Sequence, residues 1–155
     1  MMKRIFQIII LVLRIGSGGY IFHQGYEKLT GGFNITGLIP SVRDNADSPE
    51  WYKWFFENVV AHMIETFHYV IPLGEMAIGL GLIFGVLAYI ASFFGAFIMI
   101  NYILAAMIFT YPVQLAIFII LLMNRKTLNT LSLKSLLLYF KHKGDDKHDP
   151  HLTRG

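Results

Sequence analysis

The sequence predicts an all-α integral membrane protein: a four-transmembrane-helix bundle with an interfacial helix before the second span. Two observations support this fold class. Hydrophobic residues make up 55% of the 155 residues, and the mean hydropathy is positive, so the chain is more apolar than a soluble domain of this size. The hydrophobic residues also occur in long blocks, and blocks of about 20 residues are typical of helices that cross a bilayer.

Charge and cysteine content exclude several classes of protein. The formal net charge is +3, and basic residues flank the apolar blocks at both ends of the chain. This placement favours anionic lipid over nucleic acid as the charged partner. The chain contains no cysteine, which excludes disulfides, thiolate ligands and thiol-based redox chemistry. Any electron chemistry must therefore use a bound cofactor or substrate.

The first span is predicted over residues 5–22. Basic residues precede it, as in a signal peptide, but Arg14 interrupts the apolar stretch and no small-residue cleavage site follows. An uncleaved span is therefore the better interpretation. The glycine-rich residues 25–32 are expected to end this helix.

An interfacial helix is predicted before the second span. The chain after the first span is polar and rich in turn-forming residues up to Pro49, and the aromatic cluster WYKWFF follows at residues 51–56. Aromatic side chains of this kind settle at the level of the lipid headgroups. Residues 49–58 should therefore form a helix that lies in the interface and leads into the second span.

The remaining spans are predicted over residues 59–87, 89–109 and 112–123 or longer. Pro112 separates the last two, because proline suits a first helical turn and disfavours helix before it; one long helix is the alternative. At about 1.5 Å per residue the fourth segment is short for a hydrocarbon core of about 30 Å. It must tilt, thin the bilayer or continue past residue 123.

The transmembrane domain is predicted to occupy residues 1–140, and residues 141–155 to form a solvated tail. Residues 131–140 are apolar apart from Lys134, which indicates a helix on the membrane surface or an extension of the fourth span. Lysine and arginine mark both chain ends, whereas residues 25–58 mix both charges. We therefore predict a multi-pass cell-membrane protein with both termini in the cytoplasm.

Ionisable residues interrupt the first half of the second span, at His62, Glu65, His68 and Glu75. A charged group in hydrocarbon costs several kcal/mol, about 2.5 to 3.5 on insertion scales, so such groups normally face a bundle interior and have partners. Their partners are expected on the other spans.

Arg14, Glu75 and Asn101 are predicted to meet near the middle of the membrane. Counting inward from the cytoplasmic ends of the spans places all three at a similar depth. Arg14 and Glu75 on antiparallel neighbours should then form a buried ion pair, with Asn101 as a third hydrogen-bonding member. A purely structural lock is the alternative interpretation. By the same count His23 and His68 lie at matching depth near the outer interface.

Three segments carry a resemblance to a known family. They are Arg14…Gly25-x-x-Lys28, then Pro72-x-Gly74-Glu75-x-x-x-Gly79-Leu80-Gly81-Leu82-x-x-Gly85, and Asn101-Tyr102. Together they resemble the DoxX/DoxD family of small four-helix membrane proteins, over about residues 5–123. The aromatic cluster and the histidines that follow it look more like DoxD, whose members resemble the membrane subunit of a thiosulfate:quinone oxidoreductase.

The resemblance and the polar residues together predict a quinone-linked oxidoreductase or its membrane subunit, working with a soluble or membrane redox partner. We expect a cavity between the first and second spans that binds a quinone head group and is lined by Arg14, His23, His68 and Glu75. His68 or His23 would hydrogen-bond a quinone carbonyl, and Glu65 or Glu75 would relay protons.

Two other functions remain open at this point. The chain can be a non-catalytic scaffold for a redox complex, or a transporter of small molecules or lipids, with Arg14 and Glu75 purely structural. It can also bind haem, with His23 and His68 as axial ligands on facing helices. No other metal site is predicted. A homo-oligomer, the electron donor and the need for a partner subunit are left open.

Overall fold

A computed structural model of the chain describes residues 2–107 and 109–130. These residues form helices joined by short turns. In chain order the elements are α1 (Met2–Thr30), η1 (Ile35–Gly37), α2 (Leu38–Arg43), α3 (Glu50–Asn58), η2 (Val60–His62), α4 (Ile64–Phe84), α5 (Ala88–Leu104), α6 (Tyr111–Met123) and α7 (Arg125–Thr130).

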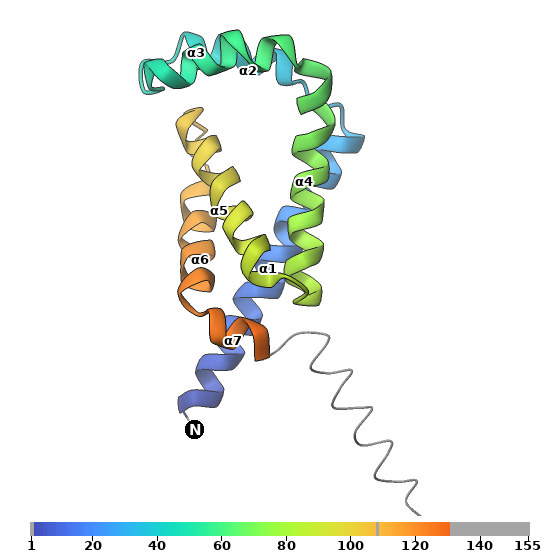
Figure 1. The fold of residues 1–155 in the computed structure, drawn as a ribbon, viewed down its shortest axis with the longest axis vertical. Coiled ribbons are helices and arrows are strands. Elements are labelled where there is room, and N and C mark those ends of the chain that lie inside the picture. The colour runs from blue at the N-terminus through green and yellow to red at the C-terminus, as the bar shows by residue number, and fades with distance from the viewer. Residues whose placement is uncertain (1, 108, 131–155) are drawn as a thin grey trace, which may run out of the picture.

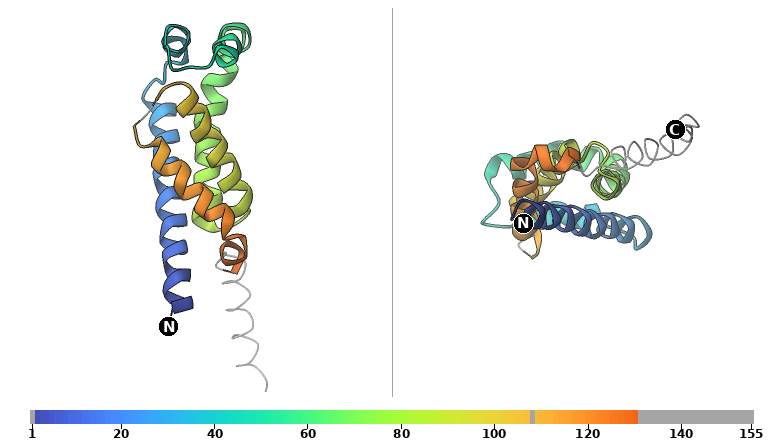
Figure 2. Two further views of the ribbon diagram at one scale, coloured as in Figure 1. Left: turned by 90° about the vertical axis from the view of Figure 1, so that its left-hand side faces the viewer. Right: turned by 90° about the horizontal axis from the view of Figure 1, so that it is seen from below.

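The four longest apolar helices, α1, α4, α5 and α6, form a bundle that is closed at one end by α2 and α3 (Figure 1). The N-terminus of α1 and the short helix α7 lie at the opposite end, as both side views show (Figure 2). The most extensive packing is between α1 and α4, followed by that between α5 and α6. The segment from η1 to η2 therefore forms a cap over one end of the bundle, which we call the cap.

Glycines bring α1 and α4 into close contact. A Cβ built on Gly25 would lie 2.6 Å from the carbonyl oxygen of Pro72, and one built on Gly79 would lie 2.6 Å from Cβ of Phe22. No larger residue fits at either position without moving a backbone, and close backbone approach of this kind is how small residues promote helix association in membranes. The contacts also define the antiparallel register, because Gly25 lies beside Pro72 and Gly18 lies beside Gly79.

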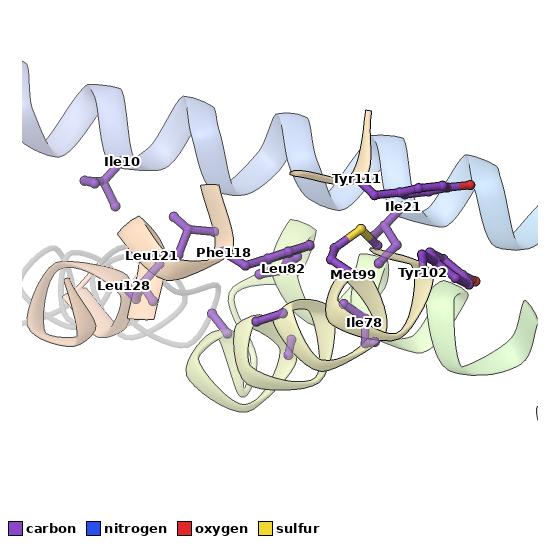
Figure 3. Packing of buried hydrophobic residues seen from close by; sticks show 13 residues of the cluster. Ile10, Ile21, Ile78, Leu82, Met99, Tyr102, Tyr111, Phe118, Leu121 and Leu128 are labelled. Atoms are coloured by element: carbon purple, nitrogen blue, oxygen red, sulfur yellow. The ribbon is translucent and has the colours of Figure 1, made fainter. Parts of the chain in front are cut away.

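The bundle core is apolar and joins all four long helices with α7. Figure 3 shows side chains of α1, α4, α5, α6 and α7 meeting in one cluster, with Phe118 of α6 near its centre. Phe118 is fully buried. Gly95 of α5 makes room for it, since a Cβ built there would lie 2.7 Å from the ring.

Several predicted boundaries differ from the structure. The helix predicted over residues 5–22 runs from Met2 to Thr30, so that Gly25 lies inside α1 and does not end it. The segment predicted as the second span, residues 59–87, contains a 3₁₀ turn followed by α4, which ends at Phe84, and α5 ends at Leu104, before the predicted residue 109. The interfacial helix before the second span is confirmed as a helix by α3, and Pro112 does separate α5 from α6. The predictions for residues 131–155 lie outside the described residues.

Within the part of the chain that the structure describes, two helices, α1 and α4, are long and apolar enough to cross a membrane. The other two are shorter, with 17 residues in α5 and 13 in α6. At 1.5 Å per residue they extend about 25 and 20 Å, less than a hydrocarbon core of about 30 Å. Asn124 ends α6, and α7 follows at once as a separate short helix.

Candidate functional site

A closed network of three side chains joins α1, α4 and α5. Lys28 Nζ lies 2.5 Å from Oε1 of Glu75 and donates to the hydroxyl of Tyr102 at 2.6 Å. The Tyr102 hydroxyl in turn donates to the same Glu75 oxygen at 2.5 Å. We call these three residues the triad. One charged residue from each of two helices and a phenol from a third are therefore held in mutual contact.

Burial makes the triad energetically important. The Glu75 side chain is 0% exposed and the Lys28 side chain 16% exposed. Charge-assisted hydrogen bonds are roughly twice as strong as neutral ones, and a low local dielectric strengthens them further. The Lys28 ammonium also lies 4.4 Å from the centre of the Tyr102 ring, which adds a cation–π contact. Glu75 Oε2, by contrast, is buried and has no hydrogen-bond partner within residues 2–107 and 109–130.

The packing of α1 on α4 explains why Lys28 reaches Glu75. Gly25 contacts Pro72 and Cβ of Glu75. Residues three apart on a helix lie on the same face, so Lys28 is one turn beyond this contact and on the same side of α1. Its long side chain then extends to the carboxylate.

A cavity of about 480 Å³ lies between α4 and α5, beneath the cap. Its wall is almost entirely apolar and consists of Ile35, Leu38, Tyr52, Phe55, Phe56, Val60, Phe67, Val70, Ile71, Gly74, Ala77, Ile78, Phe94, Phe97, Ile98, Asn101, Tyr102, Ala105 and Met107. Three of these, Val70, Phe94 and Phe97, are 50% to 56% exposed. The cavity is therefore bordered by side chains that also face outward between α4 and α5.

The triad and the cavity share Tyr102. This residue lines the cavity and donates its hydroxyl to Glu75. Three neighbours of Glu75 on α4 also line the cavity: Ile71 and Gly74, four positions and one position before it, and Ile78, three positions after it. Glu75 therefore lies at the edge of the cavity, between its wall and α1.

The cap is held to the end of α5 by two hydrogen bonds. The Tyr52 hydroxyl donates to the carbonyl of Asn101 at 2.8 Å, and Ser48 Oγ donates to the carbonyl of Leu104 at 2.9 Å. The Leu104 carbonyl is the last of α5, where carbonyls lack donors within the helix, and Ser48 supplies one. The Asn101 carbonyl also accepts from the backbone N–H of Ala105 at 3.0 Å, so Tyr52 is its second donor. Burial raises the pKa of Tyr52, which keeps its hydroxyl protonated as the donor.

The predicted Arg14–Glu75 ion pair is wrong. Glu75 pairs with Lys28, whereas the buried Arg14 donates through Nη1 to the carbonyl of Leu128 in α7 at 3.3 Å. The prediction failed because it counted depth along an 18-residue first span. The real helix has 29 residues, and the glycine contacts shift its register on α4 so that Lys28 is at the level of the carboxylate.

The prediction that Asn101 joins Arg14 and Glu75 by hydrogen bonding is also wrong. Its Nδ2 donates to the carbonyl of Phe97, and its Oδ1 lies 3.4 Å from the Tyr52 hydroxyl. It does line the cavity, however. Its place in the site is therefore beneath the cap and away from the charged residues.

The other predicted site residues lie apart from this cavity. His23 has a side chain that is 67% exposed and lies 3.4 Å from Glu27, and His68 stacks on Phe33 with ring centres 6.5 Å apart. Glu65 is exposed in the first turn of α4. The cavity was expected between the first two spans, but α1 and α4 pack closely against each other there through their glycines. None of Arg14, His23, His68 or Glu75 lines the cavity between α4 and α5.

Two triad members, Lys28 and Tyr102, were not predicted as site residues. Both belong to the motifs Gly25-x-x-Lys28 and Asn101-Tyr102. Lys28 also shares a helix face with Arg14, since 14 residues are close to four full turns. The motifs were thus the available signal, and the facing carboxylate at Glu75 was the reason to look for a second basic candidate.

Comparisons with curated proteins and with solved structures found no match. The family model described as DoxX matches residues 9–112, which is more than half of the chain. The matched segment includes all three triad residues and all of the residues that line the cavity. This protein is therefore a member of the DoxX family of membrane proteins.

Proposed function

We propose that this DoxX-family protein binds a quinone in the cavity between α4 and α5 and acts as the membrane subunit of a quinone-linked oxidoreductase. The observation that carries the proposal is the cavity itself, with its apolar wall and a buried charged network at its edge. Ligand sites commonly have about 300 to 1,000 Å³ and combine an apolar lining with a few polar groups. A volume of about 480 Å³ suits a substituted ring.

The lining favours a flat, lipid-soluble ring over a polar metabolite. Phenylalanines from α3, α4 and α5 contribute much of the wall, for example Phe55, Phe67 and Phe97. The half-exposed Val70, Phe94 and Phe97 would let such a ring enter from the surrounding lipid. A quinone combines a flat ring, a hydrocarbon tail and two polar oxygens, and so matches both the wall and its polar edge.

The redox chemistry would be divided between two components. Reduction of a quinone to a quinol takes up two electrons and two protons. In the proposal the electrons come from a soluble or membrane redox subunit, and the triad holds the charged groups nearest to the ring. Proton transfer along Lys28, Glu75 and Tyr102 needs no movement of the backbone, because the three side chains are already in hydrogen-bond contact.

We further propose that α1, α4, α5 and α6 all span the bilayer, with both termini in the cytoplasm and the cap outside. The chain contains no cysteine, so a single introduced cysteine reports its own location. Asp44→Cys, in an exposed part of the cap, should react with a membrane-impermeant maleimide added to whole cells. Reaction that requires permeabilised cells would reverse the orientation.

A cavity-filling variant tests the proposed ligand site. Ala77 lines the cavity, and Ala116 is an exposed alanine of α6 outside the cavity wall. Ala77→Phe should remove most of the quinone that co-purifies with the protein and most of the quinone-dependent quenching of its fluorescence. Ala116→Phe, the matched control, should retain both.

The same measurements decide against the proposal if wild type behaves like the filled variant. Purified wild-type protein that neither carries nor binds a quinone would exclude the ligand site. The triad would then be a structural lock joining three helices, and the protein a scaffold for a redox complex.

A further inference from the structure

We infer that the cavity prefers a ring that donates a hydrogen bond, such as the hydroxyl of a quinol or phenol, over the donor-free quinone. The inference rests on the proposed function, and it adds which redox form of the ligand the resting site recognises. It follows from counting the hydrogen-bond donors and acceptors at the edge of the cavity.

The polar side chains of the cavity wall already donate within the protein. Tyr102 donates its hydroxyl hydrogen to Glu75, and Tyr52 donates to the carbonyl of Asn101. The Asn101 amide donates one of its two hydrogens to the carbonyl of Phe97 and keeps the other. A phenol has a single hydrogen to donate, so neither tyrosine has one left for a ligand.

An acceptor, in contrast, is left over at the same place. Glu75 Oε2 has no hydrogen-bond partner among the described residues, although the Glu75 side chain is completely buried. A buried acceptor without a donor is rare in native proteins and costs free energy. Glu75 does not itself line the cavity, but its hydrogen-bond partner Tyr102 does, as do Ile71, Gly74 and Ile78 around it. In the proposal a ligand hydroxyl reaches between these side chains at the edge of the cavity and supplies the missing donor.

The two redox forms of a quinone differ in this respect. A quinone presents two carbonyl oxygens, which are acceptors and would meet the carboxylate oxygen with like partial charge. A quinol presents two hydroxyl groups, and one of them can donate to Glu75 Oε2. Hydrogen bonds to charged acceptors are the stronger kind, and a tenfold difference in affinity corresponds to about 1.4 kcal/mol.

The test is a comparison of three ligands on the full-length protein in detergent. The ligands are dodecylhydroquinone, the corresponding dodecylbenzoquinone, and dodecylhydroquinone dimethyl ether, which keeps the ring and tail but has no hydroxyl hydrogen. Dissociation constants are measured by calorimetry, anaerobically and with a reductant for the hydroquinone. We expect the hydroquinone to bind about tenfold more tightly than either of the other two.

Variants then assign the preference to the triad. Glu75→Gln removes the carboxylate and should bring the ratio of quinone to hydroquinone dissociation constants close to one. Tyr102→Phe frees one N–H of Lys28 at the edge of the cavity, and should lower the ratio by improving quinone binding; it serves if the Glu75 variant does not fold. Tyr20→Phe is the control, since that hydroxyl is bonded to Thr110 away from the cavity, and it should keep the wild-type ratio.

The outcomes separate the two proposals. Equal binding of hydroquinone and quinone, tighter quinone binding, or equal binding of the dimethyl ether would overturn the inference and leave the quinone site intact. A wild-type ratio in the folded Tyr102→Phe protein would also overturn it. If none of the three ligands binds, the proposed function fails and this inference fails with it.

Discussion

The α1–α4 contact and the α4–α5 contact are built from residues of different size, and this difference produces a tight contact in one place and a cavity in the other. Gly18 and Gly25 of α1 and Gly79 of α4 face the partner helix, so that the two backbones approach closely. Between α4 and α5, close contact is found near their connecting turn, where a Cβ built on Gly81 would lie 3.1 Å from Cβ of Ala91. Towards the cap the two helices diverge (Figure 1), and Phe67, Phe94 and Phe97 line the space between them.

The two contacts also differ in polarity. The α1–α4 contact contains the Lys28–Glu75 ion pair, whereas the wall between α4 and α5 is nearly all apolar. Tyr102 connects the two regions, because it belongs to both. Close packing of glycine helices thus holds the charges in place, and the apolar cavity beside them provides room for a ligand. The four changes below test this division, in order of decreasing effect.

The largest effect is expected from breaking the ion pair. Lys28→Met or Glu75→Leu alone should lower the free energy of unfolding by about 3 to 5 kcal/mol, since each leaves an unpaired buried charge, and the double variant should lose less than the sum. Unfolding in detergent, followed by circular dichroism, measures all three. Lys53→Met is the control; Lys53 contacts the exposed Glu50 at 2.8 Å, and surface pairs contribute about 0 to 1 kcal/mol. Strictly additive losses would show that the triad is not coupled.

Truncation of large side chains should distinguish the core from the cavity wall. Leu82→Ala removes a completely buried side chain of α4 and should cost about 2 to 5 kcal/mol through lost packing. Phe97→Ala removes a larger side chain that is 56% exposed beside the cavity and should cost less than Leu82→Ala. The midpoints of unfolding compare the two directly. A larger loss for Phe97 would mean that the cavity wall is packed like the core.

Adding one methyl group should separate the tight helix contact from an open helix face. Gly79→Ala places a Cβ 2.6 Å from Cβ of Phe22, whereas Gly19→Ala meets no neighbouring atom within 4 Å. The first should cost about 1 to 3 kcal/mol by forcing α1 and α4 apart, and the second should be neutral or stabilising because alanine favours helix. Thermal unfolding of both variants provides the test. Equal stability of the two would contradict the close packing of α1 on α4.

The smallest change concerns the cap. Tyr52→Phe removes the hydrogen bond to the carbonyl of Asn101 and should cost about 0.5 to 1.5 kcal/mol. Burial raises the pKa of Tyr52, so above about pH 10 the phenol ionises in the unfolded chain before it does so in the folded one. The stability that Tyr52 contributes is therefore full below that pH and falls as the pH rises further. Unfolding curves of wild type and variant should converge at high pH; a constant difference would contradict the assigned cause.

Much of the fold could be predicted because it depends on local patterns. Apolar blocks predicted the long helices, the aromatic cluster predicted the helix before α4, and Pro112 predicted the break between α5 and α6. The buried charge at Glu75 was also evident, because a carboxylate within an apolar stretch needs a partner wherever the helix lies. These features follow from composition and from the order of residues along one segment.

Only the tertiary structure decided which residue pairs with Glu75 and where the cavity lies. Arg14 and Lys28 lie on nearly the same face of α1, so helical periodicity does not distinguish them as partners. The register of α1 on α4 does, and it depends on which glycines meet across the contact. The cavity likewise depends on the divergence of α4 and α5 beneath the cap. Both are properties of pairs of helices, set by side-chain size on two facing surfaces at once, and a pattern within either helix does not contain them.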